Sequence, residues 1–96
     1  MMSSFTVHTT PHFDRLLRGL GKRHHDLATL YARALEILTE DPQNRTRRFH
    51  IIKLEGILRG EGQWRLALGR WRFRYDIFDR EVWLFRCGLR KEDTYR

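Results

Sequence analysis

The 96-residue chain has little cysteine, little proline and no long apolar run, and each shortage excludes a class of protein. The single cysteine, Cys87, cannot form an internal disulfide, which excludes a disulfide framework and favours a reducing compartment. No apolar segment approaches the roughly 20 residues that cross a bilayer, and the N-terminus lacks the features of a signal peptide. We therefore expect a cytoplasmic protein without a membrane partner.

Metal-ligand spacing is also missing from the sequence. The histidines are scattered, have no acidic or cysteine residues at zinc-site spacing, and are His8, His12, His24, His25 and His50. We expect neither a metal site nor a cofactor. Internal repeats and low-complexity linkers are absent as well, so residues 1–96 are expected to form one domain with a modest core.

Arginine is what the chain has in excess. The chain has 19 basic residues, of which sixteen are arginines and three are lysines, and its net charge is +7. Residues 1–44 hold five basic and five acidic residues, whereas residues 45–96 hold fourteen and seven, so the whole excess lies in the second part. Such an asymmetry is typical of nucleic-acid binders, although an acidic protein or an anionic membrane could also bind a basic surface of this kind.

Apolar periodicity predicts a strand followed by two helices in the neutral part of the chain. Residues 5–9 alternate like a short strand, and Thr10-Pro11 is a typical helix start, with threonine as the N-cap. Apolar residues at helical spacing continue to Gly21, and a second set runs from Leu27 until Asp41-Pro42. Residues 43–62 are predicted to be loop-rich, with a short apolar piece around Ile51.

A β-hairpin is predicted by the run WRLALGRWRFRY, residues 64–75. Apolar residues occupy every second position, and Gly69-Arg70 suits a two-residue turn because glycine accepts the positive φ that such turns need. This turn pairs Leu68 with Trp71 and places all the large apolar residues on one face. The opposite face receives Arg65, Ala67, Arg70, Arg72, Arg74 and Asp76.

Another turn at Asp79-Arg80 and an apolar run, residues 82–87, predict a last strand with material packed on both faces. Trp83 and Phe85 would then lie on the arginine face, either to stack on bases or, as large aromatics more often do, to pack against a neighbouring segment. The expected fold class is α+β, in the order β-α-α-β-β-β with an optional further strand. The two N-terminal helices would pack on one face of a curved antiparallel sheet.

The arginine face of the hairpin has two interpretations. Arg65 is directly opposite Arg74 in the predicted register, and like charges facing each other across two strands destabilise the pair. The face is either a solvated surface whose long side chains spread apart, or an anion site. An anion site for phosphate would benefit from arginine, because its planar fork binds two oxygens at once.

Several motifs together resemble the RelE/ParE superfamily of toxins from bacterial and archaeal toxin–antitoxin modules. They are Lys53-Leu-Glu-Gly56, the aromatic–arginine hairpin, Gly88-Leu-Arg90 and the terminal Tyr95-Arg96, and the likeness covers nearly the whole chain. The resemblance implies the fold above and a type II toxin whose cognate antitoxin wraps over it. RelE-like members are endoribonucleases that cut messenger RNA on the ribosome, whereas ParE-like members inhibit DNA gyrase and cut nothing.

The RelE pattern implies a set of site residues in this chain. Arg65, Arg72, Arg90 and Tyr95 would be catalytic, promoting attack of a ribose 2′-OH on its own 3′ phosphate. Further basic residues would bind RNA, namely Arg47, Arg48, Lys53, Arg70 and Arg74. The expected partners are the antitoxin, the ribosome and messenger RNA, and the toxin without its antitoxin is expected to be a monomer.

The chain departs from the RelE pattern at two hairpin positions where that pattern has lysines, because Arg65 and Ala67 stand there. Arginine remains protonated and is therefore a poor general base, although it still binds phosphate and stabilises developing charge. Tyr95, Lys53 and His50 are candidates for a replacement base, and the sequence does not rank them. The missing lysines also keep open a gyrase-inhibiting function of the ParE kind.

Overall fold

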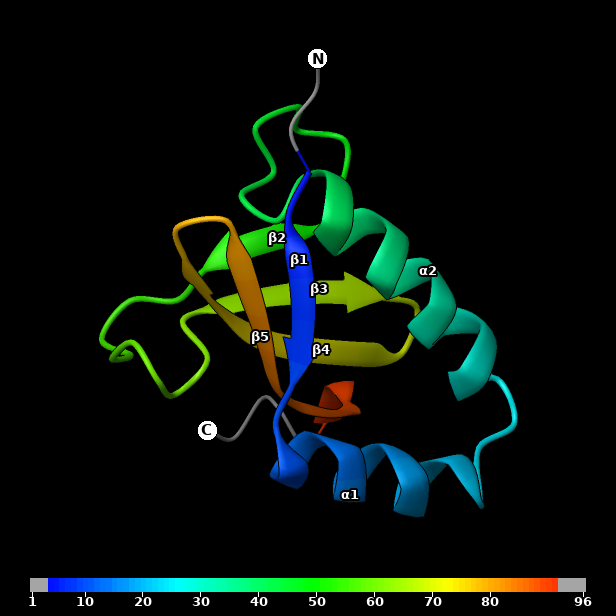
Figure 1. Ribbon diagram of the computed structural model, residues 1–96. Coiled ribbons are helices and arrows are strands. Elements are labelled where there is room, and N and C mark those ends of the chain that lie inside the picture. The colour runs from blue at the N-terminus through cyan, green and yellow to red at the C-terminus, as the bar shows by residue number, and fades with distance from the viewer. Residues whose placement is uncertain (1–3, 92–96) are drawn as a thin grey trace.

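Two helices and five strands make up residues 4–91, the part of the chain that the computed structural model describes (Figure 1). Strand β1 (Thr6–Thr9) leads into helices α1 (Pro11–Gly21) and α2 (Leu27–Glu40). The remaining strands are β2 (Ile51–Lys53), β3 (Trp64–Leu68), β4 (Trp71–Phe78) and β5 (Glu81–Leu89), and the sheet order is β1-β5-β4-β3-β2. The α+β class and the order of elements predicted from the sequence are confirmed, and the short apolar piece at Ile51 is the optional strand.

The sheet is mixed, which corrects the prediction of a wholly antiparallel sheet. Strand β1 pairs with β5 in parallel, with Thr6 opposite Glu81 and Thr9 opposite Leu84, whereas all the other neighbours are antiparallel. Alternation along a strand predicts which residues share a face but carries no information about the direction of a distant neighbour. The direction of β1 is decided by its docking beside β5, 75 residues later in the chain.

The β3–β4 hairpin has the predicted register throughout. Leu68 is opposite Trp71 and Arg65 is opposite Arg74, with the two-residue turn at Gly69-Arg70. Gly69 has φ +56, a conformation that glycine adopts without steric cost. We call the face of the sheet that carries Leu66 and Phe73 the inner face, and the opposite face, which carries Arg65 and Arg72, the outer face.

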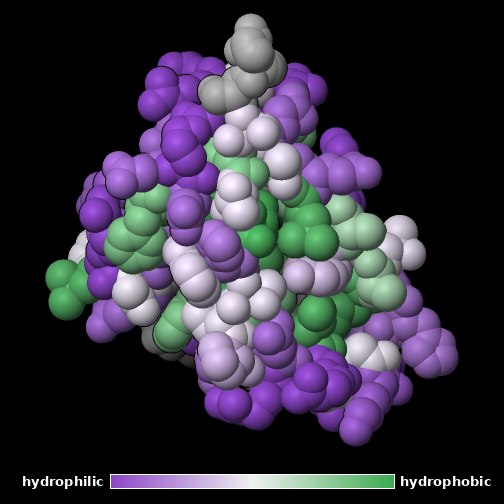
Figure 2. Space-filling model, viewed as in Figure 1, coloured by the Kyte–Doolittle hydropathy of each residue, from purple (hydrophilic) through white to green (hydrophobic). Residues whose placement is uncertain are grey.

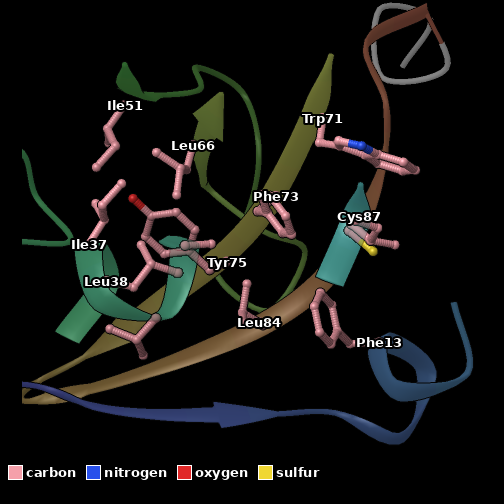
Figure 3. Packing of buried hydrophobic residues seen from close by; sticks show 13 residues of the cluster. Phe13, Ile37, Leu38, Ile51, Leu66, Trp71, Phe73, Tyr75, Leu84 and Cys87 are labelled. Carbon is pink, nitrogen blue, oxygen red and sulfur yellow. The ribbon is translucent and has the colours of Figure 1, made fainter. Parts of the chain in front are cut away.

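Both helices cover the inner face. The side-chain oxygen of Thr10 accepts a hydrogen bond from the Phe13 backbone N–H at 3.0 Å, which confirms the predicted N-cap of α1. In Figure 3, Ile37 and Leu38 of α2 point toward Leu66 and Tyr75, while Phe13 of α1 lies near Leu84 and Cys87. These side chains are buried and form the core that fixes the helices against the sheet.

A β-bulge in β5 shifts the alternation of this strand by one residue. Arg74 pairs with Arg86 but Tyr75 pairs with Leu84, so Phe85 is an extra residue in β5. The extra residue returns Cys87 to the inner face with Leu84. Trp83 pairs with Asp76 and lies on the outer face as predicted, where its ring stacks on His8 of β1 with centroids 4.3 Å apart. This stacking favours the packing interpretation of Trp83.

The hairpin turn is tied to the connection between the two helices. The Asp26 carboxylate accepts hydrogen bonds from the Arg70 guanidinium at 3.0 and 3.2 Å and from the Trp71 indole N–H at 3.0 Å. The bonds from Arg70 and then Trp71 lower the pKa of Asp26 to about 2. Because the folded-state pKa is below the usual carboxyl value, this contribution to stability is complete above about pH 4 and is lost as the pH falls toward about 2.

Part of the apolar surface of the helices remains accessible beside β1. Figure 2 shows apolar side chains gathered between β1 and α2, with hydrophilic side chains over the outside of α1. Several apolar residues of β1, α1 and α2 are only partly buried against the core, among them Val7, Leu16, Leu20 and Leu30. Within residues 4–91 neither helix has the length and apolar character needed to cross a membrane.

Candidate nucleic-acid interface

Basic side chains line up across the outer face because residues directly opposite one another in adjacent strands share a face. Arg65 of β3, Arg74 of β4 and Arg86 of β5 form one row. The next row contains Ala67, Arg72 and Gly88, so the large side chain of Arg72 lies between two small residues. Because its neighbours in this row are small, there is open space beside Arg72.

That space is an open hollow of about 430 Å³ on the outer face. Its lining residues come from β2, β3, β4 and the loop before β2, and are Phe49, His50, Ile51, Ile52, Arg65, Ala67 and Arg72. We call it the basic hollow. It is open to solvent and carries two guanidinium groups, so it suits a phosphate with part of a nucleotide better than a deeply enclosed small molecule.

Arg72 is held in place by its own strand end. Its Nη1 atom donates hydrogen bonds to the backbone oxygens of Gly69 at 2.8 Å and Trp71 at 2.9 Å. These bonds to the turn fix the orientation of the guanidinium group before any ligand arrives. A preorganised donor of this kind stabilises developing negative charge without the cost of ordering a flexible side chain.

Arg74, which the sequence predicts to bind RNA, is buried beneath a loop on the outer face. It is 6% exposed, and its guanidinium donates hydrogen bonds to the backbone oxygens of Gly62 at 2.8 Å and Glu61 at 3.2 Å. Asp76 completes the attachment, because its carboxylate accepts from the N–H groups of Gly62 and Gln63 at 3.0 Å. Residues 54–63, the clamp loop, are thereby fastened over part of the outer face.

Replacing Arg74 with alanine should destabilise the fold by about 1.5–3 kcal/mol, because two carbonyls of the clamp loop lose a charged donor. The measurement is urea unfolding followed by tryptophan fluorescence. Arg15→Ala is the control, because it removes the same charge from an exposed position of α1. Equal losses of stability in the two variants would contradict the structural role of Arg74.

Two more of the expected RNA-binding residues point away from the basic hollow. Lys53 pairs with Trp64, so it lies on the inner side of the sheet edge, and its Nζ atom is 5.7 Å from the Trp64 ring centroid. Arg70 is at the hairpin turn and is bound to Asp26. Neither side chain joins Arg65 and Arg72, because strand alternation places Lys53 on the other face and the ion pair draws Arg70 toward the helices.

The remaining predicted residues lie around the interface or outside the described chain. Arg48 pairs with Glu40 and lies 4.8 Å from the ring centroid of Phe49, a lining residue of the hollow. Arg47 is exposed in the same loop. The Arg90 backbone N–H donates to the Arg70 oxygen at 2.8 Å, which places Arg90 just beyond Gly88, the β5 partner of Arg72. Tyr95 lies outside the described residues.

His50 is a candidate base whose position in the fold was not predicted from the sequence. The structure puts it in the lining of the basic hollow together with Arg65 and Arg72. The sequence feature that could have located His50 is its position directly before the apolar pair Ile51-Ile52, because a strand predicted for that pair could include His50 as its first residue. That strand is only three residues long, too short for alternation to establish its register from sequence.

Metal-ligating clusters and the single cysteine were the other candidate reactive groups in residues 4–91. No cluster of three or more histidine, cysteine or acidic side chains in this part of the chain is arranged to hold a metal ion. Burial raises the pKa of the Cys87 thiol to about 12, so the thiol stays protonated at neutral pH. Cys87 therefore acts as a small apolar core residue.

The fold and the outer face define a class of protein: a small α+β domain with an open mixed sheet, helices on one face and a basic hollow on the other. No protein-family model matches the sequence, and no curated protein is significantly similar to it. Solved structures, in contrast, match almost the whole chain.

The chain resembles the RelE partner of toxin–antitoxin complexes. It is 26% identical to a chain of the RelBE2 toxin–antitoxin complex from Mycobacterium tuberculosis, with a TM-score of 0.65 over 91% of this chain and 99% of that chain. The RelB–RelE complex from Methanococcus jannaschii matches at 16% identity and TM-score 0.63, over 92% of this chain and 95% of that chain. The RelE–RelB complex from Pyrococcus horikoshii matches at 20% and 0.62, over 93% and 97%. The latter two show the shared fold.

Proposed function

We propose that this protein is the toxin of a type II toxin–antitoxin system and acts as a ribosome-dependent messenger-RNA endonuclease. The observation that carries the proposal is the basic hollow, in which Arg65, Arg72 and His50 meet on an accessible face of a RelE-like fold. Phosphate recognition needs fixed cationic forks, and acid–base chemistry needs a titratable group beside them. The hollow contains both.

The reaction that suits these residues is internal transfer at an RNA phosphodiester. The ribose 2′ oxygen attacks the adjacent phosphorus, the bond from phosphorus to the 5′ oxygen breaks, and the products are a 2′,3′-cyclic phosphate and a 5′-hydroxyl end. Arg65 and Arg72 bind the non-bridging oxygens and stabilise the charge that develops on them. Arg90 and Tyr95 are proposed to complete the set, and Arg47 and Arg48 to attract the RNA backbone.

The proposed partners follow from the neighbours and from the surface. The similar structures contain a toxin together with its antitoxin, so we propose a cognate antitoxin for this chain. Partly buried apolar residues between β1 and the helices offer apolar contacts to such a partner, and the outer face offers positive charge to RNA on the ribosome. We propose that the protein acts in the cytoplasm and that the toxin is a monomer without its antitoxin.

This function is tested by incubating purified protein with ribosomes programmed with a defined messenger RNA. We expect cleavage between nucleotides in the A site, with a 5′-hydroxyl on the downstream fragment, and much slower cleavage of the same RNA without ribosomes. Primer extension locates the cut. Intact message after prolonged incubation with folded protein would disprove the endonuclease.

A second candidate function is inhibition of DNA gyrase without RNA cleavage. The observation that favours it is Ala67, which puts a methyl group on β3 at a position where the RelE pattern has a lysine. A gyrase supercoiling assay on the same preparation distinguishes the two functions. Inhibition of supercoiling with intact message would select this second function, and unaffected supercoiling would remove it.

A further inference from the structure

We propose that His50 is the general base of this site and accepts the proton of the attacking ribose 2′-OH. The inference rests on the proposed endonuclease and assigns one atom-level role within it. Of the two candidate bases within the described residues, Lys53 lies on the inner side of the sheet edge. His50 lines the basic hollow directly.

The sheet register places His50 beside the position that lacks a lysine. Ile51 pairs with Leu66, and the Ala67 N–H donates to the His50 backbone oxygen at 2.9 Å, so the pairing of β2 with β3 continues one residue further. His50 is therefore opposite Ala67, which is itself opposite Arg72. Because paired residues share a face, the three side chains lie in one row on the outer face, and the methyl group of Ala67 leaves open the space between imidazole and guanidinium.

The loop before His50 is preorganised by side-chain hydrogen bonds. Asn44 is bound to the Phe49 backbone twice: its Nδ2 atom donates to the Phe49 oxygen at 2.8 Å, and its Oδ1 atom accepts from the Phe49 N–H at 3.0 Å. The Asp41 carboxylate accepts from the Arg45 and Thr46 N–H groups and from the Thr46 hydroxyl at 2.7–3.0 Å. His50 thus has a fixed backbone on both sides, between Phe49 and the bond to Ala67.

The charged groups that face His50 across the basic hollow are Arg65 from β3 and Arg72 from β4, and no carboxylate is among the lining residues of the hollow. Arg47 and Arg48 belong to the loop before it. A neutral imidazole has a ring nitrogen that can accept a proton, whereas a guanidinium group offers donors and no acceptor. The arginines bind the phosphate and His50 handles the proton.

A ring nitrogen of His50 takes the proton from the 2′-OH while the 2′ oxygen forms its bond to phosphorus. The bond from phosphorus to the 5′ oxygen breaks, and this oxygen takes a proton from water. The imidazolium then gives its proton to the hydroxide that is left, so the net change moves one proton from the 2′ to the 5′ oxygen.

The test measures single-turnover cleavage on programmed ribosomes with wild-type protein, His50→Ala and His50→Gln. Loss of the base should lower the rate by about 10²–10⁴-fold. The pH profile of the rate should also differ between the wild type and both variants, because the variants lack the group that accepts the proton. His25→Ala is the matched control, because His25 is exposed between the two helices, away from the hollow.

Ala67→Lys in the His50→Ala background is the second variant, and it should restore cleavage because a lysine at the facing position supplies a base to the same space. Thermal melting confirms that each variant is folded. Wild-type rates and an unchanged pH profile in His50→Ala would overturn the role of His50 while leaving the endonuclease intact. A wild-type protein that cuts nothing would instead overturn the proposed function itself.

Discussion

Replacing Arg72 with alanine should lower the rate of messenger-RNA cleavage by about 10²–10³-fold, which corresponds to about 3–4 kcal/mol of transition-state stabilisation. The effect is large because the guanidinium is already fixed by the Gly69 and Trp71 oxygens and faces the basic hollow. Its loss removes a preorganised positive charge where the phosphate becomes more negative. Single-turnover cleavage on programmed ribosomes measures the change.

Two comparisons make the Arg72 result specific. Arg15→Ala removes the same charge from the exposed side of α1 and should leave the rate nearly unchanged. Arg72→Lys should recover only part of the rate, because an ammonium group keeps the charge but loses the planar two-oxygen contact. A rate for Arg72→Ala equal to that of Arg15→Ala would show that the basic hollow does not bind the reacting phosphate.

Replacing Trp71 with alanine should destabilise the protein by about 3–5 kcal/mol, as expected for a fully buried aromatic side chain. Trp71 is 0% exposed, at the end of the hairpin where the helices meet the sheet. Its ring is in edge contact with His24, and its indole N–H is bound to Asp26. The substitution therefore removes core volume and the link between the hairpin and the helix connection together.

Trp71→Phe separates these two contributions. Phenylalanine keeps most of the buried volume but cannot donate to Asp26, so a loss of about 1–2 kcal/mol is expected from this variant. Thermal and urea unfolding followed by circular dichroism measure both changes. If Trp71→Ala and Trp71→Phe were equally destabilised, the hydrogen bond to Asp26 rather than packing would account for the role of Trp71.

The β3–β4 hairpin is the part of the fold that could be predicted most completely from the sequence. Strict alternation in residues 64–75 and a Gly-Arg turn predicted every pairing between β3 and β4, because a two-residue turn leaves one register possible. The predicted N-cap of α1 was confirmed for a similar reason, since Thr10-Pro11 acts within one turn of helix. Both features depend on residues close together in the chain.

Long-range features were less predictable. The bulge at Phe85 and the parallel pairing of β1 with β5 depend on partners that alternation cannot identify. Arg74 and Arg72 are equivalent in the sequence pattern, two positions apart on one face. Only the clamp loop distinguishes them, because it buries Arg74 under Gly62 and leaves Arg72 in the basic hollow.

The sequence by itself determined the α+β class, the hairpin with its arginine face and the location of the positive charge, because these follow from local periodicity and composition. The resemblance to RelE was carried by short motifs, which are also local in the chain. The tertiary structure alone decided which basic groups share a site. It brought His50 beside Ala67 and Arg72, turned Lys53 to the inner side and engaged Arg74 with the clamp loop. The physical reason is that burial, strand partners and loop contacts arise between segments far apart in the chain.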